Sequence, residues 1–182
     1  MPPSSSQWIK RHLKDPAVKL ANQLNYRSRA AVKLLELDKK HNLFPRDKNN
    51  AQTALDLGAS PGSWSQVLAT KYRNVYAIDQ LYMDPIHNVT FLQANFPECR
   101  QQVRDMLHGQ KVNIVLSDMS PNRSGHSQID HGRIIDLLVS VTGMFFSPFA
   151  LGGLVDSLSW FQLANTEFLK IPFHFQSSLA KI

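Results

Sequence analysis

Short runs of apolar residues alternate along the chain with segments whose apolar residues recur at helical spacing. The runs of strand length cover residues 53–57, 74–78, 90–93 and 112–117. Helical patterns cover residues 63–72 and 97–108, and a long apolar helical pattern covers residues 129–146. Strands that recur with intervening helices predict an α/β fold, in which a doubly wound parallel sheet is covered by helices on both faces.

The segment before the first strand predicts two helices. Asp15 followed by Pro16 is a helix-start signal, and this helix should run to about Leu24. Ser28 is predicted to cap a second helix. The apolar stripe of that second helix comprises Ala31, Leu34, Leu35 and Leu37. Residues 44–50 (FPRDKNN) are rich in turn-forming residues and predict a loop before the first strand.

The composition is that of one globular domain without disulfides. With 182 residues, 43% of them hydrophobic and 19% charged, the chain is long enough to bury a sizeable core. Its one cysteine, Cys99, excludes an internal disulfide and a metal site built from several thiolates, and we expect no metal. No apolar run approaches the roughly 20 residues of a membrane-spanning helix, so we expect no membrane partner. We also expect a monomer.

The net charge of +6 is concentrated near the N-terminus. Residues 1–50 contain eleven Lys or Arg against four acidic residues, whereas the rest of the chain contains nine against ten. This asymmetry favours contact with a polyphosphate, so we expect the basic segment 10–48, including Arg27, Arg29 and Lys39, to face RNA. The alternative is that these side chains form an ordinary solvated helix face.

Residues 1–14 are interpreted as a basic N-terminal arm. They contain no acidic residue and place Lys10, Arg11 and Lys14 near Trp8. This composition fits either a remnant of an amphipathic mitochondrial presequence or an arm of the mature protein.

The first strand ends in a small, tight loop with the sequence GASPG, from Gly58 to Gly62. The carboxyl ends of strands are where open α/β sheets bind ligands, and the two glycines are expected to let a ligand approach the backbone. The loop lacks the middle glycine of the G-x-G-x-x-G fingerprint, and Pro61 removes a backbone donor. It is therefore a poor phosphate cradle and better suits S-adenosylmethionine, a cofactor with adenosine but no phosphate.

Two further residues at strand ends fit the same cofactor. Asp79 ends the second strand, where a carboxylate can accept both ribose hydroxyls. Asn95 follows the third strand, and its amide can both donate to and accept from the edge of an adenine. The alternatives are that Asp79 caps a helix and that Asn95 starts a turn.

The fourth strand ends in VLSDMSPNRSG, which places Asp118 at the same ligand-binding edge. Together with YRSRAAVKLLELD, LDLGASPGSWSQV, FLQANF and SDMSPNRSGHSQIDH, this stretch resembles the FtsJ-type (RrmJ) ribosomal RNA 2′-O-methyltransferases. The opening QWIKRHLKDPAVKLA is most similar to the mitochondrial members of that family. The resemblance covers roughly residues 7–153.

The resemblance implies transfer of a methyl group from S-adenosylmethionine to the ribose 2′-hydroxyl of a uridine in large-subunit ribosomal RNA. It implies a Rossmann-like class I methyltransferase sheet over residues 15–182, ribosomal RNA or a pre-ribosomal particle as partner, and a mitochondrial location, with nucleus or cytoplasm as alternatives. The positions that match cofactor contacts are Gly62, Trp64, Asp79, Asn95 and Asp118. Lys33 and Asp118 match the first lysine and the aspartate of the family's catalytic Lys-Asp-Lys-Glu tetrad.

The chain departs from the family in three places. The family usually has Asp where this chain has Asn95, and the tetrad's second lysine, expected on a fifth strand after Gly153, falls on Leu158. The sequence ends at Ile182, before the position expected for the tetrad glutamate, so we expect a domain that is incomplete after about residue 153 and a sheet without its last strands.

Three functions therefore remain open at the level of the sequence. The first is an active RNA 2′-O-methyltransferase, and the second is an inactive relative or truncated gene product that binds cofactor or RNA and assists ribosome assembly. A nicotinamide-dependent oxidoreductase is the weakest of the three, because its loop would have to cradle a pyrophosphate.

Overall fold

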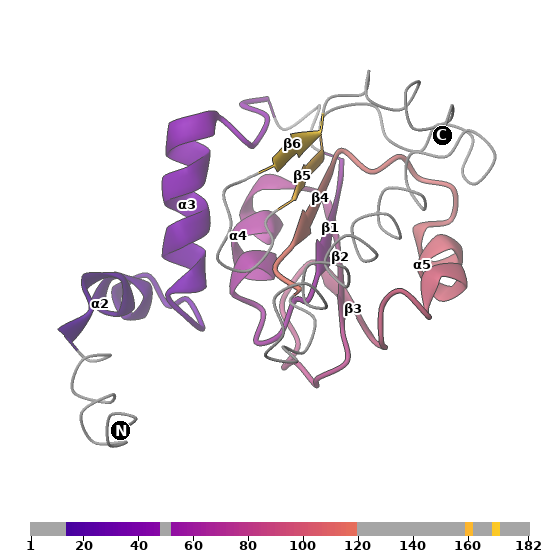
Figure 1. The fold of residues 1–182 in the computed structure, drawn as a ribbon, viewed down its shortest axis with the longest axis horizontal. Helices are drawn as coiled ribbons and strands as arrows, with labels where there is room; N and C mark the ends of the chain where they lie inside the picture. The colour runs from indigo at the N-terminus through magenta and orange to yellow at the C-terminus, as the bar shows by residue number, and fades with distance from the viewer. Residues whose placement is uncertain (1–13, 48–51, 120–158, 162–168, 172–182) are drawn as a thin grey trace, which may run out of the picture.

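The computed structural model describes residues 14–47, 52–119, 159–161 and 169–171 (Figure 1). The helix predicted at residues 129–146, Leu158 and most of the basic arm lie outside these ranges. The helices are α2 (Pro16–Gln23), α3 (Ala30–His41), α4 (Ser63–Lys71) and α5 (Arg100–Leu107). The strands are β1 (Thr53–Leu57), β2 (Asn74–Asp79), β3 (Val89–Gln93), β4 (Ile114–Ser117), β5 (Ser159–Phe161) and β6 (Leu169–Ile171).

Four strands form a parallel sheet in the order β3-β2-β1-β4. The order runs from β1 outward in both directions, which is the arrangement of the first four strands of a doubly wound fold and confirms the predicted class. Because all four strands run the same way, the chain leaves each of them at the same edge of the sheet. The order reverses between β1 and β4, and such a switch point is where folds of this type bind ligands.

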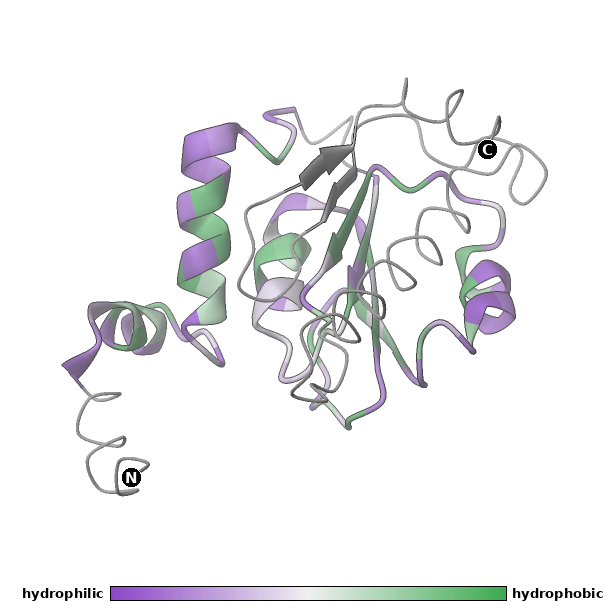
Figure 2. Cartoon of the chain, in the orientation of Figure 1, coloured by the Kyte–Doolittle hydropathy of each residue, from purple (hydrophilic) through white to green (hydrophobic). Residues whose placement is uncertain are grey.

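The two faces of the sheet bury different sets of residues. Alternate residues of a strand point to opposite faces, so Leu55 and Leu57 of β1 pack with α5, whereas Ala54 packs with α4 and α3. Figure 1 shows α4 and α3 on one side of the sheet and α5 on the other. In Figure 2 the hydrophobic colour follows the strands, and hydrophilic colour covers much of α5. The sheet is therefore enclosed by helices as the pattern predicted.

The two N-terminal helices begin close to the predicted residues. The carboxylate of Asp15 accepts the amide of Ala17 at 2.9 Å, which confirms Asp15 as the cap of α2. The second cap is shifted: Arg29 immediately precedes α3, whereas the hydroxyl of Ser28 accepts the amide of Ala30 at 3.2 Å. Ser28 thus satisfies an amide of the first turn from one residue further out than predicted.

The predicted strands and helices agree with the described elements to within three residues at each end. The largest differences are at the starts of α5 and β4, which begin three and two residues later than the pattern indicates. A fifth strand is present after Gly153, because β5 lies beside β4. It pairs with β6 in an antiparallel two-stranded sheet separate from the parallel one.

The loop after β1 passes very close to the loop after β4. Gly58 has a φ of +80°, and a Cβ built on it would lie 2.7 Å from Met119 Cγ and 3.1 Å from the Met119 amide nitrogen. The sequence predicted that a ligand would enter this space, but Met119, which follows β4, occupies it. The glycine is required because the ends of β1 and β4 approach one another here.

Replacement of Gly58 by Ala should be much more costly than replacement of another left-handed glycine. Gly109 has a φ of +74° with no atom within 4 Å of a built Cβ, so Gly109→Ala should cost only the backbone strain, about 1 kcal/mol. Gly58→Ala adds a clash with backbone and should cost roughly 1–3 kcal/mol more. The free energy of unfolding from urea titration measures both variants, and equal losses would contradict the close approach.

Candidate functional site

The loop that follows β1, residues 58–62, uses all of its backbone donors within the protein. The amides of Gly58 and Ala59 both donate to the Ile78 carbonyl, at 2.9 and 3.1 Å. The Ser60 amide donates to the Asp79 carboxylate at 2.9 Å, and the Gly62 amide donates to the Ala59 carbonyl at 2.6 Å. Pro61 has no amide hydrogen. This loop therefore has no free amide for a pyrophosphate, in agreement with the sequence argument against a phosphate cradle.

Asp79 is held in a fixed orientation at the end of β2. One carboxylate oxygen accepts a hydrogen bond from the Ser60 amide, and the other accepts one from the Leu81 amide at 2.8 Å. Each oxygen keeps a further lone pair, because an ionised carboxylate offers about four acceptor sites. Asp79 can therefore still accept hydrogen bonds from the hydroxyl groups of a ligand at this edge, which is the role that the sequence predicts for it.

A third carboxylate, which the sequence reasoning missed, lies beneath the loop. Asp56 is buried in the middle of β1, and its Oδ2 accepts the hydroxyl of Ser65 of α4 at 2.6 Å. Its Oδ1 has no partner among the described residues. Burial, with smaller contributions from the charges of Asp118 and Asp79, raises the pKa of Asp56 to about 7, while the Ser65 hydroxyl opposes the shift. The available signal was an acidic residue inside an otherwise apolar strand, because such residues are rarely buried without a partner.

The structure brings together the two residues that the sequence assigned to catalysis. Asp118 follows β4, and its amide donates to the Leu57 carbonyl at 3.2 Å, which fixes it beside the end of β1. Partial burial of its carboxyl group raises the pKa of Asp118, and the nearby ammonium of Lys33 on α3 lowers it. Within the described ranges no ion pair joins the two directly.

Two other predicted site residues use their side chains in contacts within the protein. The indole of Trp64 is buried in the core between α4 and α3, and its N–H donates to the Ala30 carbonyl at 2.9 Å. Its side chain is therefore structural, and only its backbone in the first turn of α4 faces the ligand-binding edge. The side-chain nitrogen of Asn95 donates a hydrogen bond to the Glu98 carboxylate at 2.8 Å, and the backbone carbonyl of Asn95 accepts one from the Cys99 backbone amide. The turn alternative for Asn95 is thus present, and its exposed amide oxygen can still accept a bond.

The carboxyl-terminal edge of the parallel sheet carries acidic side chains, whereas the loop of residues 58–62 has no free backbone amide. Asp79 and Asp118 lie at the ends of the strands on either side of β1, and their charges add to the rise in the pKa of the buried Asp56. Such a set favours a ligand that carries positive charge and hydroxyl groups over a polyphosphate. Among the described residues there is no group of three or more His, Cys, Asp or Glu side chains arranged to hold a metal, and no helix there is long and apolar enough to cross a membrane.

The buried carboxyl of Asp56 should make the stability of the protein depend on pH. As the pH rises above about 4, Asp56 ionises in the unfolded chain but keeps its proton in the folded one until about pH 7, so the free energy of unfolding falls over this window. Asp56→Asn keeps the shape of the side chain and should remove this fall in the free energy of unfolding, which amounts to up to about 4 kcal/mol. Urea titrations of both proteins between pH 4 and 8 measure the difference, and parallel curves would contradict a protonated Asp56.

Comparisons with known proteins identify the family. The profile of the FtsJ-like methyltransferases matches residues 26–171. The chain is 42% identical over 139 residues to the ribosomal RNA large subunit methyltransferase E of Ehrlichia chaffeensis, and 45% identical over 141 residues to that of a Psychrobacter species. Each alignment covers 74% of this chain and 64% of the relative. The chain therefore spans just under two thirds of the length of these curated relatives.

A solved structure supports the same assignment. The crystal structure described as that of a ribosomal RNA methyltransferase from Plasmodium falciparum aligns with a TM-score of 0.61 and 30% sequence identity. The alignment covers 76% of this chain and 77% of the other. The sequence and the fold thus agree, and the chain is a member of the FtsJ-like methyltransferase family.

Proposed function

We propose that the protein transfers a methyl group from S-adenosylmethionine to the ribose 2′-hydroxyl of a uridine in large-subunit ribosomal RNA. The observation that carries this proposal is that Asp118, whose amide is fixed to the end of β1, is near enough to the Lys33 ammonium for that charge to lower its pKa, at the edge of the sheet that also holds the loop after β1 and Asp79. Membership of the family and the names of the relatives support an RNA methyltransferase. The uridine and a mitochondrial location rest on the sequence resemblance and stay predictions.

The residues at the edge fit S-adenosylmethionine by their chemistry. Asp79 offers acceptors for two ribose hydroxyls, and the carboxylates of Asp79 and Asp118 favour the positive charges of a sulfonium and an ammonium group. The loop of residues 58–62 has no amide left for a phosphate. The amides of the first turn of α4, which have no partner within the helix, supply donors for a carboxylate.

The chemistry required of the protein is alignment and the handling of one proton. When bound, the cofactor supplies an electrophilic methyl group. The ribose hydroxyl must point its oxygen along the line of transfer and lose its proton. Asp118 can accept a hydrogen bond from that hydroxyl and take up its proton as the oxygen gains the methyl group, and the ammonium of Lys33 stabilises the negative charge that develops on the oxygen. Lys33 reaches this position because α3 packs against α4, whose first turn lies at the same edge.

A second candidate function is binding without turnover. It is favoured by the sequence, in which no lysine occurs between Lys111 and Lys170, so that Leu158 stands where the family has its second lysine. Lys170 is the described lysine nearest to that region in the chain: it lies on β6, in register with Trp160 of β5, and β5 lies beside β4. Lys170 is therefore the lysine to test as a source of a second ammonium.

Transfer of tritiated methyl groups to undermethylated large-subunit RNA tests the proposal, with 2′-O-methylation recognised by its resistance to alkali. Under single-turnover conditions at saturating RNA, Lys33→Met and Asp118→Asn should each lower the rate about 10²–10⁴-fold. Lys40→Met, an exposed lysine near the end of the same helix, is the matched control and should keep the parent rate.

The outcomes separate the two candidates. Transfer that survives Lys33→Met would contradict the proposed role of Lys33. A parent protein that binds the cofactor but transfers no methyl group supports the binding function instead. If the parent protein is active, loss of activity in Lys170→Met identifies Lys170 as the second ammonium.

A further inference from the structure

Arg27 lies in the linker between α2 and α3, and its guanidinium contacts two loops at the ligand-binding edge. Its Nη1 donates to the Pro61 carbonyl and to the Asp84 carbonyl, both at 2.8 Å, and its Nη2 donates to the Pro85 carbonyl at 3.0 Å. Pro61 belongs to the loop after β1, whereas Asp84 and Pro85 belong to the loop after β2. One side chain therefore joins the N-terminal helices to both loops that surround Asp79.

The backbone around Arg27 is attached to α4 as well. The Arg27 amide donates to the side-chain oxygen of Gln66 at 2.8 Å, and the side-chain nitrogen of Gln66 donates to the Asn25 carbonyl at 3.1 Å. The hydroxyls of Ser28 and Ser63 lie 2.6 Å apart. The linker is thus fixed to the first turns of α4 on one side and to the two loops on the other.

The second glycine of the loop is explained by the same contact. Gly62 has a φ of +105°, and a Cβ built on it would lie 2.7 Å from Arg27 Nη1. A side chain at position 62 would therefore press on the guanidinium of Arg27 and on the side chains of Met83 and Ile86, each 2.7 Å from the built Cβ. The sequence reasoning assigned this space to a ligand, but in the structure it is taken by Arg27 and by the side chains of Met83 and Ile86.

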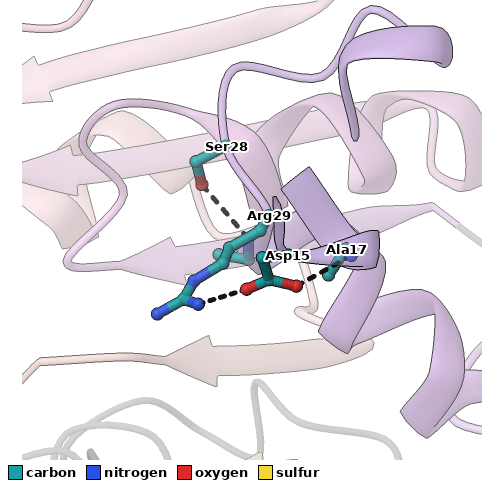
Figure 3. Close-up of polar contacts among 5 residues, drawn as sticks. Asp15, Ala17, Ser28 and Arg29 are labelled. Atoms are coloured by element: carbon teal, nitrogen blue, oxygen red, sulfur yellow. Dashed lines mark hydrogen bonds and ion pairs between the residues drawn. The ribbon is translucent and has the colours of Figure 1, made fainter. Parts of the chain in front are cut away.

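Arg29, the neighbouring arginine, has a different environment. Its guanidinium is exposed and pairs with the carboxylate of Asp15 at the start of α2 (Figure 3). Figure 3 also shows Asp15 accepting the Ala17 amide, so Arg29 contributes to the start of α2. The two arginines, which the sequence reasoning grouped as phosphate contacts, are therefore separable by experiment.

We propose that Arg27 is a positioning residue, which holds the α2–α3 linker against the loops after β1 and β2 and thereby sets Lys33 opposite Asp118, rather than a contact to RNA phosphate. The inference rests on the proposed function, since it assigns Arg27 a part in cofactor binding and methyl transfer. Three carbonyls held at once require the planar fork of a guanidinium, which a single ammonium does not reproduce. α3 starts three residues after Arg27, so movement of the linker moves Lys33 on the first turn of that helix.

The test compares Arg27→Lys and Arg27→Gln with Arg29→Gln as the matched control. Both Arg27 variants should raise the dissociation constant and the KM for S-adenosylmethionine about tenfold, while RNA affinity and its salt dependence stay those of the parent. The pKa of Asp118, followed by NMR, should rise in Arg27→Lys, because Lys33 no longer lies close enough to lower it. Arg29→Gln should leave cofactor binding and the pKa of Asp118 unchanged.

A phosphate contact would give the opposite pattern. In that case Arg27→Lys, which keeps the charge, would retain cofactor and RNA affinity, and Arg27→Gln would weaken RNA binding and flatten its salt dependence by about one unit. That result overturns the inference while leaving the proposed function in place. A parent protein that does not bind S-adenosylmethionine contradicts the proposed function itself.

Hydrogen exchange tests the positioning role without any cofactor. In Arg27→Lys the amides of residues 25–30 and 58–62 should exchange faster than in the parent, and in Arg29→Gln they should not. Should Arg27→Lys fail to fold, Gln66→Ala removes the other attachment of the linker and should produce the same acceleration and the same loss of cofactor affinity. Unchanged exchange in the variant that folds would contradict the inference.

Discussion

The site depends on one set of backbone hydrogen bonds, those that tie the loop after β1 to the end of β2. Gly58 and Ala59 donate to the Ile78 carbonyl and Ser60 donates to Asp79, so the loop lies flat against the neighbouring strand. The same bonds orient the Asp79 carboxylate and place the first turn of α4 at the sheet edge. Because the amides are used internally, the loop offers no free backbone donor to an anion.

Charge is the second constraint on this edge. The charges of Asp79 and Asp118 oppose ionisation of the buried Asp56 on the strand between them, and the structure limits the cost of gathering these carboxyl groups in two ways. Asp56 is buried deeply enough for its pKa to rise to about 7, and Lys33 acts on Asp118 from α3. A bound cation would relieve the remaining repulsion. The N-terminal helices therefore contribute directly to the electrostatics of the sheet edge, in addition to any contact that they make with RNA.

The sequence predicted the strands, their parallel arrangement and the positions of Asp79 and Asp118, because apolar runs and strand ends follow local rules. It did not predict contacts that depend on how distant segments meet. Trp64 reads as a ligand contact in its motif, yet its indole faces α3 because the first turn of α4 packs there. The role of Arg27 depends on three carbonyls that lie more than thirty positions away along the chain. Asp56 was also missed, but the sequence did contain a signal for it, because it is an acidic residue inside an apolar strand.

The central claim is that this sheet edge selects a cationic adenosine cofactor without phosphate. Isothermal titration calorimetry with S-adenosylmethionine and with NAD, on the same protein at the same salt concentration, tests it most directly. The account predicts saturable binding of S-adenosylmethionine, one molecule per chain, and no displacement of it by NAD. Preferential binding of NAD would contradict the account, because the loop of residues 58–62 would then have to release its internal hydrogen bonds to hold a pyrophosphate.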